Sequence, residues 1–139
     1  MMNTIVRGLM ILVSIMLLSS LHVYAADIKH GVTHISQQEL AVKLKNANVV
    51  LIDIRTQSEV DKGFIPGATH IPLAQIQNNI SLLDDYANKE LIFYCHSGVR
   101  VRKLTDYLQK IDHSSKESLY HLKGDMRAWR ARGNEIQIQ

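Results

Sequence analysis

Cys95 is the residue of this chain whose type and setting most clearly suggest covalent chemistry. It is the only cysteine, and it follows a strand-like apolar run over residues 91–94. A helix-like stretch begins soon afterwards, at Val99. A thiol at such a junction lies among unpaired backbone N–H groups at the positive end of the helix dipole, which favours the thiolate. The sequence therefore predicts a reactive cysteine.

The first 25 residues indicate where this thiol works. Arg7 gives a weakly positive start, residues 9–21 form an apolar core interrupted only by serines, and Ala25 suits signal peptidase. We therefore expect a secretory signal at residues 1–25, cleaved after Ala25, and a periplasmic or secreted protein. The alternative is an uncleaved membrane anchor, because a spanning helix needs about 20 apolar residues and this stretch comes close.

Export changes the interpretation of a single cysteine, because such a chain can form no disulfide within itself. A free thiol in an oxidising compartment is open to oxidation and to wrong pairing. Use in chemistry therefore explains Cys95 better than packing does. The alternative is a buried cysteine that behaves as a small hydrophobic residue.

The rest of the chain, residues 26–139, has the size of one compact domain. The net charge of +3 falls to +2 when Arg7 leaves with the signal. That charge is too small to indicate a nucleic-acid partner, or a membrane partner after signal cleavage. The seven histidines lack the paired spacing of zinc ligands, so no metal site is predicted.

Strand and helix signals alternate along this domain. Strands are predicted at residues 32–35, 49–52, 69–71, 90–94 and 118–122, and helices at residues 37–46, 73–86, 99–110 and 126–132. The first helix follows a capping box at residues 36–39 and has Leu40, Ala41 and Leu44 on one face, and the second should break near Asn78 and Asn79. The alternation predicts an α/β domain with a mainly parallel central sheet and helices on both faces. Ligands bind beyond the carboxyl ends of such strands, where Cys95 lies.

Four groups of residues together resemble a single-domain rhodanese. They are Asp53-Ile54-Arg55 with Glu59; residues 63–72, GFIPGATHIP; residues 95–100, CHSGVR; and Leu122-Lys123-Gly124 with Trp129 and Gly133. Their order and spacing match that family across residues 26–139. The resemblance implies the rhodanese-like fold, an α/β domain with a central parallel sheet.

The resemblance also implies a sulfurtransferase in which Cys95 is catalytic. The thiolate attacks the outer sulfur of a small anionic donor such as thiosulfate, keeps it as a persulfide, and passes it to a thiol or cyanide acceptor. No metal or organic cofactor is implied. The residues agree with this chemistry, because inward-turned N–H groups of the loop form a nest for an anion and Gly98 supplies the backbone freedom.

The residues after Cys95 are expected to bind the substrate. They are His96, Ser97, Gly98, Val99 and Arg100. Ser97 adds a hydroxyl donor, and His96 is placed to tune the thiolate or contact the acceptor. Arg100 adds a fixed positive charge, either on the anion directly or through a buried carboxylate that braces the loop.

Three charged residues, Asp53, Arg55 and Glu59, follow the predicted strand at residues 49–52. They form either a salt-bridged brace or the lining of the active-site mouth. Carboxylates beside an anion site would repel the substrate unless they were neutralised. We therefore expect Asp53 and Glu59 to be supporting residues and Arg55 to contact the ligand.

The spacing from Cys95 to Arg100 separates two related chemistries. Cysteine-dependent phosphatases and arsenate reductases of the rhodanese-like type resemble this chain but have a loop one residue longer. Such a loop would place the arginine at position 101, where this chain has Val101. The shorter loop resembles the sulfurtransferase form.

Three positions depart from the family pattern. Phe64 stands where a histidine is usual, Val101 where a serine or threonine is frequent, and Asp125 where a second glycine is common. These changes affect substrate preference and loop geometry but leave the nucleophile. A non-catalytic binding or stress-response module is the alternative to an enzyme, and the intact Cys95 and Arg100 favour the enzyme.

Overall fold

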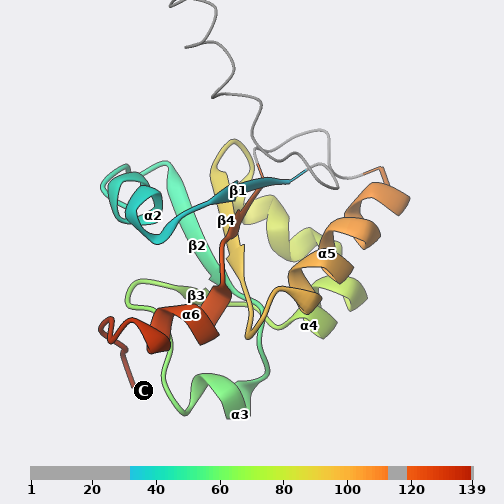
Figure 1. Cartoon of the computed structure of the whole chain (residues 1–139). Coiled ribbons are helices and arrows are strands. Elements are labelled where there is room, and N and C mark those ends of the chain that lie inside the picture. Colours follow the sequence, from blue (N-terminus) through green and yellow to red (C-terminus); the bar gives the residue numbers. More distant parts are fainter. Residues whose placement is uncertain (1–31, 113–118, 139) are drawn as a thin grey trace, which may run out of the picture.

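The computed structural model describes residues 32–112 and 119–138 of the chain (Figure 1). The predicted signal at residues 1–25 lies outside the described residues, as does Ser118 at the start of the last predicted strand. Among the helices of the described segments, none is long and apolar enough to cross a membrane.

A parallel sheet forms the centre of the domain, as predicted. In the described part of the chain it has five strands: β1 (Thr33–Ile35), β2 (Val49–Asp53), β3 (Thr69–His70), β4 (Glu90–Tyr94) and β5 (Leu119–Leu122). The strand order is β1-β5-β4-β2-β3, and all neighbouring pairs are parallel. β4 is the central strand, so Cys95 follows the carboxyl end of the best-protected strand of the sheet.

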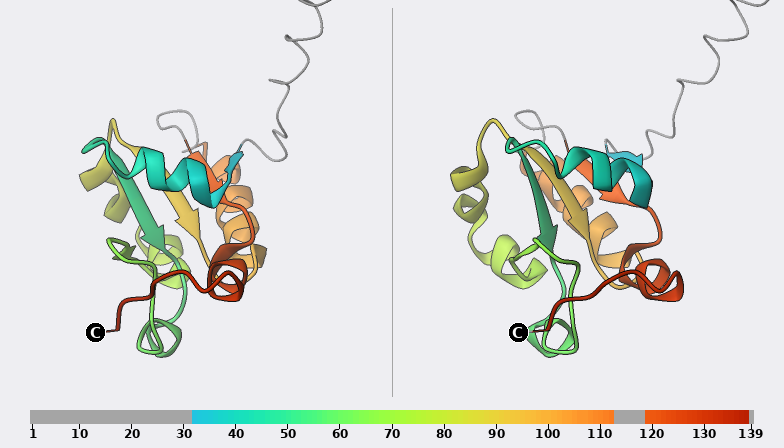
Figure 2. Two further views of the ribbon diagram at one scale, coloured as in Figure 1. Left: turned by 60° about the vertical axis from the view of Figure 1, so that its left-hand side comes forward. Right: turned by 90° about the vertical axis from the view of Figure 1, so that its left-hand side faces the viewer.

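Helices cover both faces of this sheet, which confirms the predicted α/β layers (Figure 2). They are α2 (Gln37–Lys43), α3 (Gln57–Val60), α4 (Leu73–Asn78), the 3₁₀ helix η2 (Ile80–Tyr86), α5 (Val99–Lys110) and α6 (Asp125–Ala131). Buried residues of α4, η2 and α5 pack on one face of the sheet, whereas those of α2 and α6 pack on the other.

β4 shows how the sequence creates these two layers. Leu91, Phe93 and Cys95 belong to the core cluster under α4 and α5. Ile92 and Tyr94 belong to the cluster under α2 and α6. A strand with helices on both sides is apolar on both of its faces, which is why residues 91–94 form a continuous apolar run after Glu90 at the start of the strand. The thiol of Cys95 therefore approaches the site from the α4 and α5 side of the sheet.

The amino-terminal helix differs from its prediction. α2 begins after the capping residue Ser36, as predicted, but it ends at Lys43 rather than at residue 46. The backbone N–H of Asn48 donates to the side-chain oxygen of Asn46 at 2.9 Å, and this local turn competes with another helical turn. Only Leu40 of the expected apolar face is buried, whereas Ala41 and the C-cap residue Leu44 are exposed.

Two other elements concern the site more directly. The helix predicted at residues 73–86 is broken at Asn79, as expected, between α4 and η2. The short helix α3 has no counterpart in the predicted elements. The N–H and hydroxyl of Thr56 both donate to the Glu59 carboxylate, at 3.1 and 2.9 Å, so Thr56 and Glu59 hold its first turn. α3 places Glu59 beside the loop that follows Cys95.

Candidate active site

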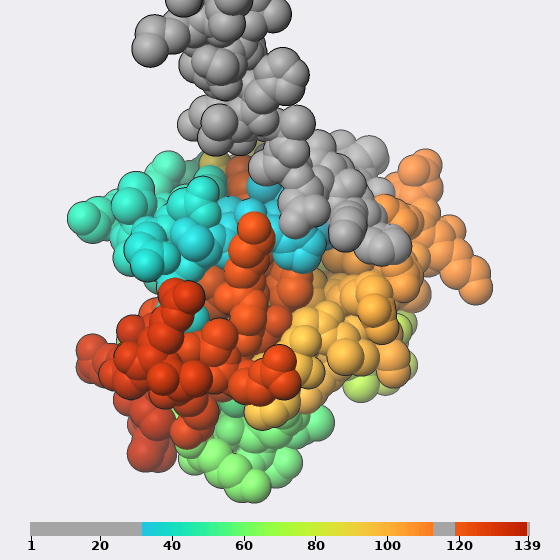
Figure 3. All heavy atoms as spheres, viewed as in Figure 1, coloured from blue at the N-terminus to red at the C-terminus, as the bar shows by residue number. Residues whose placement is uncertain are grey.

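The Cys95 loop lies where three segments meet at the carboxyl edge of the sheet. On the face shown in Figure 3, the segment after β4 lies between α6 and α3. Backbone N–H groups of Met126 and Arg127 in α6 donate to the carbonyl oxygens of Cys95 and His96, at 3.0 and 3.1 Å. Glu59 of α3 binds the other end of the loop through Arg100. Both ends of the loop are therefore attached to neighbouring helices.

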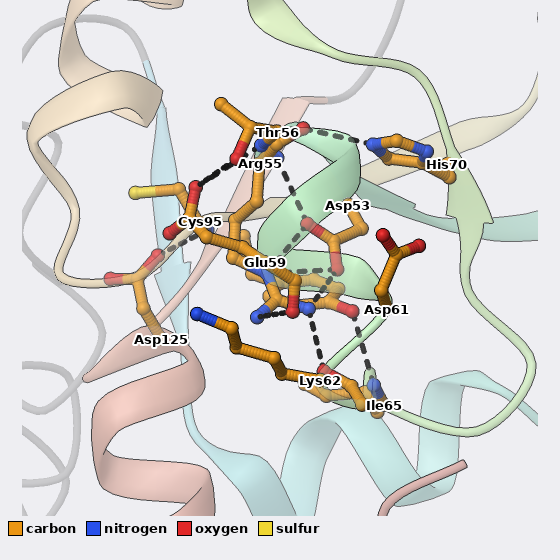
Figure 4. A network of polar contacts seen from close by, with 12 residues as sticks. Asp53, Arg55, Thr56, Glu59, Asp61, Lys62, Ile65, His70, Cys95 and Asp125 are labelled. Carbon is orange, nitrogen blue, oxygen red and sulfur yellow. Dashed lines mark hydrogen bonds and ion pairs between the residues drawn. The ribbon is translucent and has the colours of Figure 1, made fainter. Parts of the chain in front are cut away.

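Cys95 is 1% exposed and receives a hydrogen bond on its sulfur. The backbone N–H of Gly98 donates to its Sγ atom at 3.1 Å. This N–H belongs to the residue that caps the amino end of the 12-residue helix α5, where the helix dipole is positive. Both effects stabilise a negative sulfur, as thiolate or as persulfide. The backbone N–H of Cys95 itself points elsewhere and donates to the Asp125 carboxylate at 2.7 Å (Figure 4).

Gly98 gives the loop its turn, as the sequence predicts. Its φ angle is +88°, a left-handed conformation that glycine adopts without strain. A Cβ atom at this position would lie 3.2 Å from the Oδ2 atom of Asp125 and 3.2 Å from the Cε1 atom of His121. A larger residue would therefore push the loop away from β5 and α6, and the Gly98 N–H away from the sulfur.

Arg100 braces the loop through a carboxylate, which is one of its two predicted roles, but this carboxylate is half-buried rather than buried. Its Nη1 and Nη2 atoms donate to the two oxygens of Glu59 at 2.6 and 2.8 Å. These hydrogen bonds lower the pKa of Glu59 to about 2 and raise the pKa of Arg100. The pair is about 30% exposed, and it is charged throughout the physiological pH range.

Asp53 and Arg55 form a second, buried brace. Arg55 is 3% exposed; its Nε atom donates to both Asp53 oxygens at 2.9 and 3.0 Å, and its Nη2 atom donates to Asp53 at 2.6 Å. Nη2 also donates to the carbonyl of Gly63 at 3.0 Å, whereas Nη1 has only a long contact, 3.4 Å, with the carbonyl of Glu59. In Figure 4 the sulfur of Cys95 points away from this pair. Most of the guanidinium is thus used structurally, and the predicted contact of Arg55 with a ligand stays a prediction.

Two cavities flank the loop. One, of about 330 Å³, opens near His96, and we call it the mouth cavity; its lining residues are Arg55, Glu59, Lys62, His96, Met126 and Arg130. The other, of about 300 Å³, lies behind the loop, where Ser97, Gly98 and Val99 face β1, β5 and α5. His96 and Ser97 are exposed, so each is accessible from outside. The structure thus brings all the predicted site residues to one edge of the sheet.

The segment after α3 forms one wall of the mouth cavity. Arg130 of α6 donates through Nη2 to the carbonyl of Lys62 at 2.6 Å, and the hydroxyl of Tyr94 accepts the N–H of Ile65 at 3.1 Å. Phe64, which stands where the family has a histidine, is 7% exposed and bridges to Gln137 by two backbone hydrogen bonds of 2.9 Å. Its side chain therefore packs inside the protein.

Sequence reasoning missed the roles of Asp125, His121 and Arg130. Asp125 is predicted only as a departure from the family pattern, but it accepts the N–H of Cys95 and contacts His121 at 2.9 Å. Arg130 is part of a basic run, Arg127, Arg130 and Arg132, that reads as a solvated surface. The contacts of Asp125 with Cys95 and of Arg130 with Lys62 join residues 30 and 68 positions apart, so no local signal reveals them. His121 lies only four positions from Asp125, but its role follows from the contact of Asp125 with Cys95. Within residues 32–112 and 119–138, no three His, Cys, Asp or Glu side chains gather as a metal ion would require.

Known proteins show the same fold and family. A protein of Allochromatium vinosum named sulfurtransferase is 29% identical over 106 residues, which cover 76% of this chain and 94% of that protein. A tRNA uridine(34) hydroxylase of Buchnera aphidicola is 28% identical over 96 residues, which cover 66% of this chain but only 30% of that protein. The crystal structure of a rhodanese-like domain protein from Staphylococcus aureus is similar with a TM-score of 0.59 and 30% identity, covering 76% of this chain and 97% of that one. The family model described as rhodanese-like domain matches residues 36–132. With well over half of its length matched, the chain belongs to the rhodanese-like domain family.

Proposed function

We propose that this protein is a sulfurtransferase that carries sulfur as a persulfide on Cys95. The observation that carries the proposal is the hydrogen bond from the Gly98 N–H to the Cys95 sulfur, at the amino end of α5, in a chain of the rhodanese-like family. An N–H group and a helix dipole aimed at one sulfur stabilise an anion there. The same groups serve both the attacking thiolate and the persulfide that it forms.

The proposed reaction has two steps and leaves the enzyme unchanged. The Cys95 thiolate attacks the outer sulfur of thiosulfate; a new S–S bond forms to Cys95, and sulfite leaves with the electron pair of the broken S–S bond. Cyanide or a thiolate then attacks the outer sulfur of the persulfide and takes it. The second step breaks the bond to Cys95 and restores the thiolate.

The mouth cavity supports the approach of an anionic donor. Lys62 and Arg130 line it and are exposed, so their charges reach the solvent in front of the loop. Glu59, the one carboxylate among its lining residues, is already paired with Arg100. A cavity of net positive charge raises the local concentration of anions.

Arg100 argues against the phosphatase alternative. Two of its five N–H groups are bound to Glu59, so the face of the guanidinium that would bind two oxygens of a phosphate group through both Nη atoms is already occupied. The expected consequence is that the protein does not hydrolyse p-nitrophenyl phosphate.

The non-catalytic alternative predicts instead that the cleft holds a partner without turnover.

Steady-state turnover tests the proposed function. Purified protein is incubated with thiosulfate and cyanide, and thiocyanate is measured over time. We expect turnover by the wild type, none by Cys95→Ser, and turnover within about threefold of wild type for Ser97→Ala, because the loop keeps its backbone N–H groups. Equal thiocyanate formation by Cys95→Ser and wild type would contradict a role for this sulfur.

A further inference from the structure

Asp125 occupies an unusual position next to the nucleophile. It is the first residue of α6, it is 1% exposed, and its φ angle of +53° is left-handed. A glycine would adopt this conformation without strain, whereas other residues adopt it at a cost of about 1 to 2 kcal/mol. Strain of this kind is retained where the side chain has a use. The contacts of Asp125 show that use.

The carboxylate of Asp125 connects β5 to Cys95. Its Oδ1 atom accepts the backbone N–H of Cys95 at 2.7 Å, and its Oδ2 atom lies 2.9 Å from the Nε2 atom of His121 (Figure 4 shows the first contact). His121 is itself mostly buried, with 12% of its side chain exposed, and its ring lies 4.9 Å from that of His34. Asp125 is thus held in one orientation, directly behind the loop that binds the sulfur.

Neither of the two arginines that brace the loop neutralises Asp125. The arginines that brace the site already have carboxylate partners, because Arg100 pairs with Glu59 and Arg55 pairs with Asp53. His121 carries a positive charge only when it is protonated. Because the carboxylate binds the backbone N–H of Cys95 at 2.7 Å, it lies within the same residue's surroundings as the sulfur, and the protein interior screens its charge less than water does. This charge disfavours each additional negative charge on the incoming molecule.

We propose that Asp125 is a selectivity-determining residue that makes Cys95 react preferentially with sulfur donors of low negative charge. This inference rests on the proposed sulfur transfer and adds the class of donor. Thiosulfate, a dianion, still reacts but is disfavoured relative to singly charged or neutral donors, such as thiosulfonates and persulfides. With methanethiosulfonate anion, the thiolate takes the outer sulfur and methanesulfinate leaves with the electron pair, so the persulfide product is the same.

The relative rates of two alkylating agents measure this charge effect without any sulfur transfer. Iodoacetate is an anion and iodoacetamide is neutral, and both alkylate Cys95, the only cysteine of the chain. The thiolate fraction cancels in the ratio of the two rate constants, so the ratio reports the local potential. Asp125→Asn keeps an oxygen that can accept the Cys95 N–H and removes the charge. Asp125→Gly removes the charge and suits the left-handed backbone.

We expect the iodoacetate-to-iodoacetamide ratio to rise about three- to tenfold in Asp125→Asn and in Asp125→Gly. The matched control is Asp84→Asn, which removes one charge from an exposed residue of η2, ahead of β4, whereas Cys95 follows β4. Its ratio should stay within twofold of wild type. An unchanged ratio in both Asp125 variants, or an equal rise in Asp84→Asn, would overturn the role of Asp125.

A comparison of two sulfur donors of different charge then tests whether the charge of Asp125 also affects sulfur transfer. Asp125→Asn should raise kcat/KM for thiosulfate about three- to tenfold more than kcat/KM for methanethiosulfonate. An equal change for both donors would show that Asp125 only positions the loop, and would overturn the selectivity. If wild type takes sulfur from neither donor, the proposed function fails, and the alkylation ratio still decides the role of Asp125.

Discussion

Arg100 and Glu59 join the start of α5 to α3 through two parallel hydrogen bonds of 2.6 and 2.8 Å. The residues lie 41 positions apart in the sequence, so this contact attaches the end of the Cys95 loop to a helix from a distant part of the chain. Bidentate arginine–carboxylate pairs are directional as well as attractive. The geometry of the sulfur site therefore depends on a pair that touches no sulfur.

Replacing Glu59 by Gln should lower the free energy of unfolding at pH 7 by about 1 to 2 kcal/mol. The neutral amide accepts only one of the two hydrogen bonds, and the Arg100 charge loses its partner. Urea denaturation of the two proteins measures the difference. The exposed control Asp84→Asn should stay within about 0.5 kcal/mol of wild type, and an equal loss in both variants would contradict a specific role for the pair.

The same pair predicts a pH dependence of stability. Arg100 lowers the pKa of Glu59 from 4.5 to about 2 in the folded protein. Because the folded-state pKa lies below the unfolded one, the stabilisation is complete above about pH 4.5 and is lost as the pH falls toward 2. The stability difference between wild type and Glu59→Gln should therefore shrink across this interval. A difference that stays constant from pH 6 to pH 2.5 would contradict the assigned ion pair.

Gly124 and Gly133 provide a comparison of backbone strain with steric overlap. Both have a left-handed φ, +80° and +70°, but a Cβ on Gly124 would lie 2.4 Å from the Cβ of Ala128, whereas a Cβ on Gly133 meets nothing within 4 Å. Gly133→Ala should cost about 1 kcal/mol and Gly124→Ala about 2 to 5 kcal/mol, measured by urea denaturation. Gly124→Ala should also slow alkylation of Cys95. Gly124 precedes Asp125, which binds the backbone N–H of Cys95, so a shift at Gly124 disturbs the Cys95 loop. Equal costs at both positions would refute the steric argument.

Arg55 is the predicted site residue whose role most needs a test. Arg55→Gln leaves the buried Asp53 carboxylate without its partner and should cost about 3 to 5 kcal/mol of stability. The double variant Asp53→Asn/Arg55→Gln removes both charges and should be more stable than Arg55→Gln alone. Measurements of KM for thiosulfate in the double variant separate the two roles. A structural Arg55 leaves KM within about threefold of wild type, and a ligand contact raises it more than tenfold.

The fold could be predicted because the apolar pattern of a strand indicates which of its faces are buried. The run at residues 91–94 is apolar on both faces, so it had to lie between two layers of helices, and the alternation of elements then implies parallel neighbours. The length of α2 was predicted wrongly, because the polar turn at Asn46 competes locally with the helix.

The site was predictable only as far as its residues are adjacent in the chain. The loop from Cys95 to Arg100 and its glycine turn follow from six consecutive positions. The partners of that loop do not: Glu59 reaches Arg100 only because α3 forms, and Asp125 reaches Cys95, 30 positions away, only because β5 lies next to β4. Sequence reasoning therefore left Arg100 with two roles and assigned none to His121.

The mass of the intact protein after treatment with thiosulfate tests directly whether Cys95 carries sulfur as a persulfide. A persulfide on Cys95 predicts a gain of the mass of one sulfur atom in the wild type, its loss on addition of cyanide, and no gain in Cys95→Ser. Methanethiosulfonate provides the singly charged donor for the same measurement. Wild-type protein with a free Cys95 thiol that gains no sulfur from either donor would contradict the persulfide mechanism.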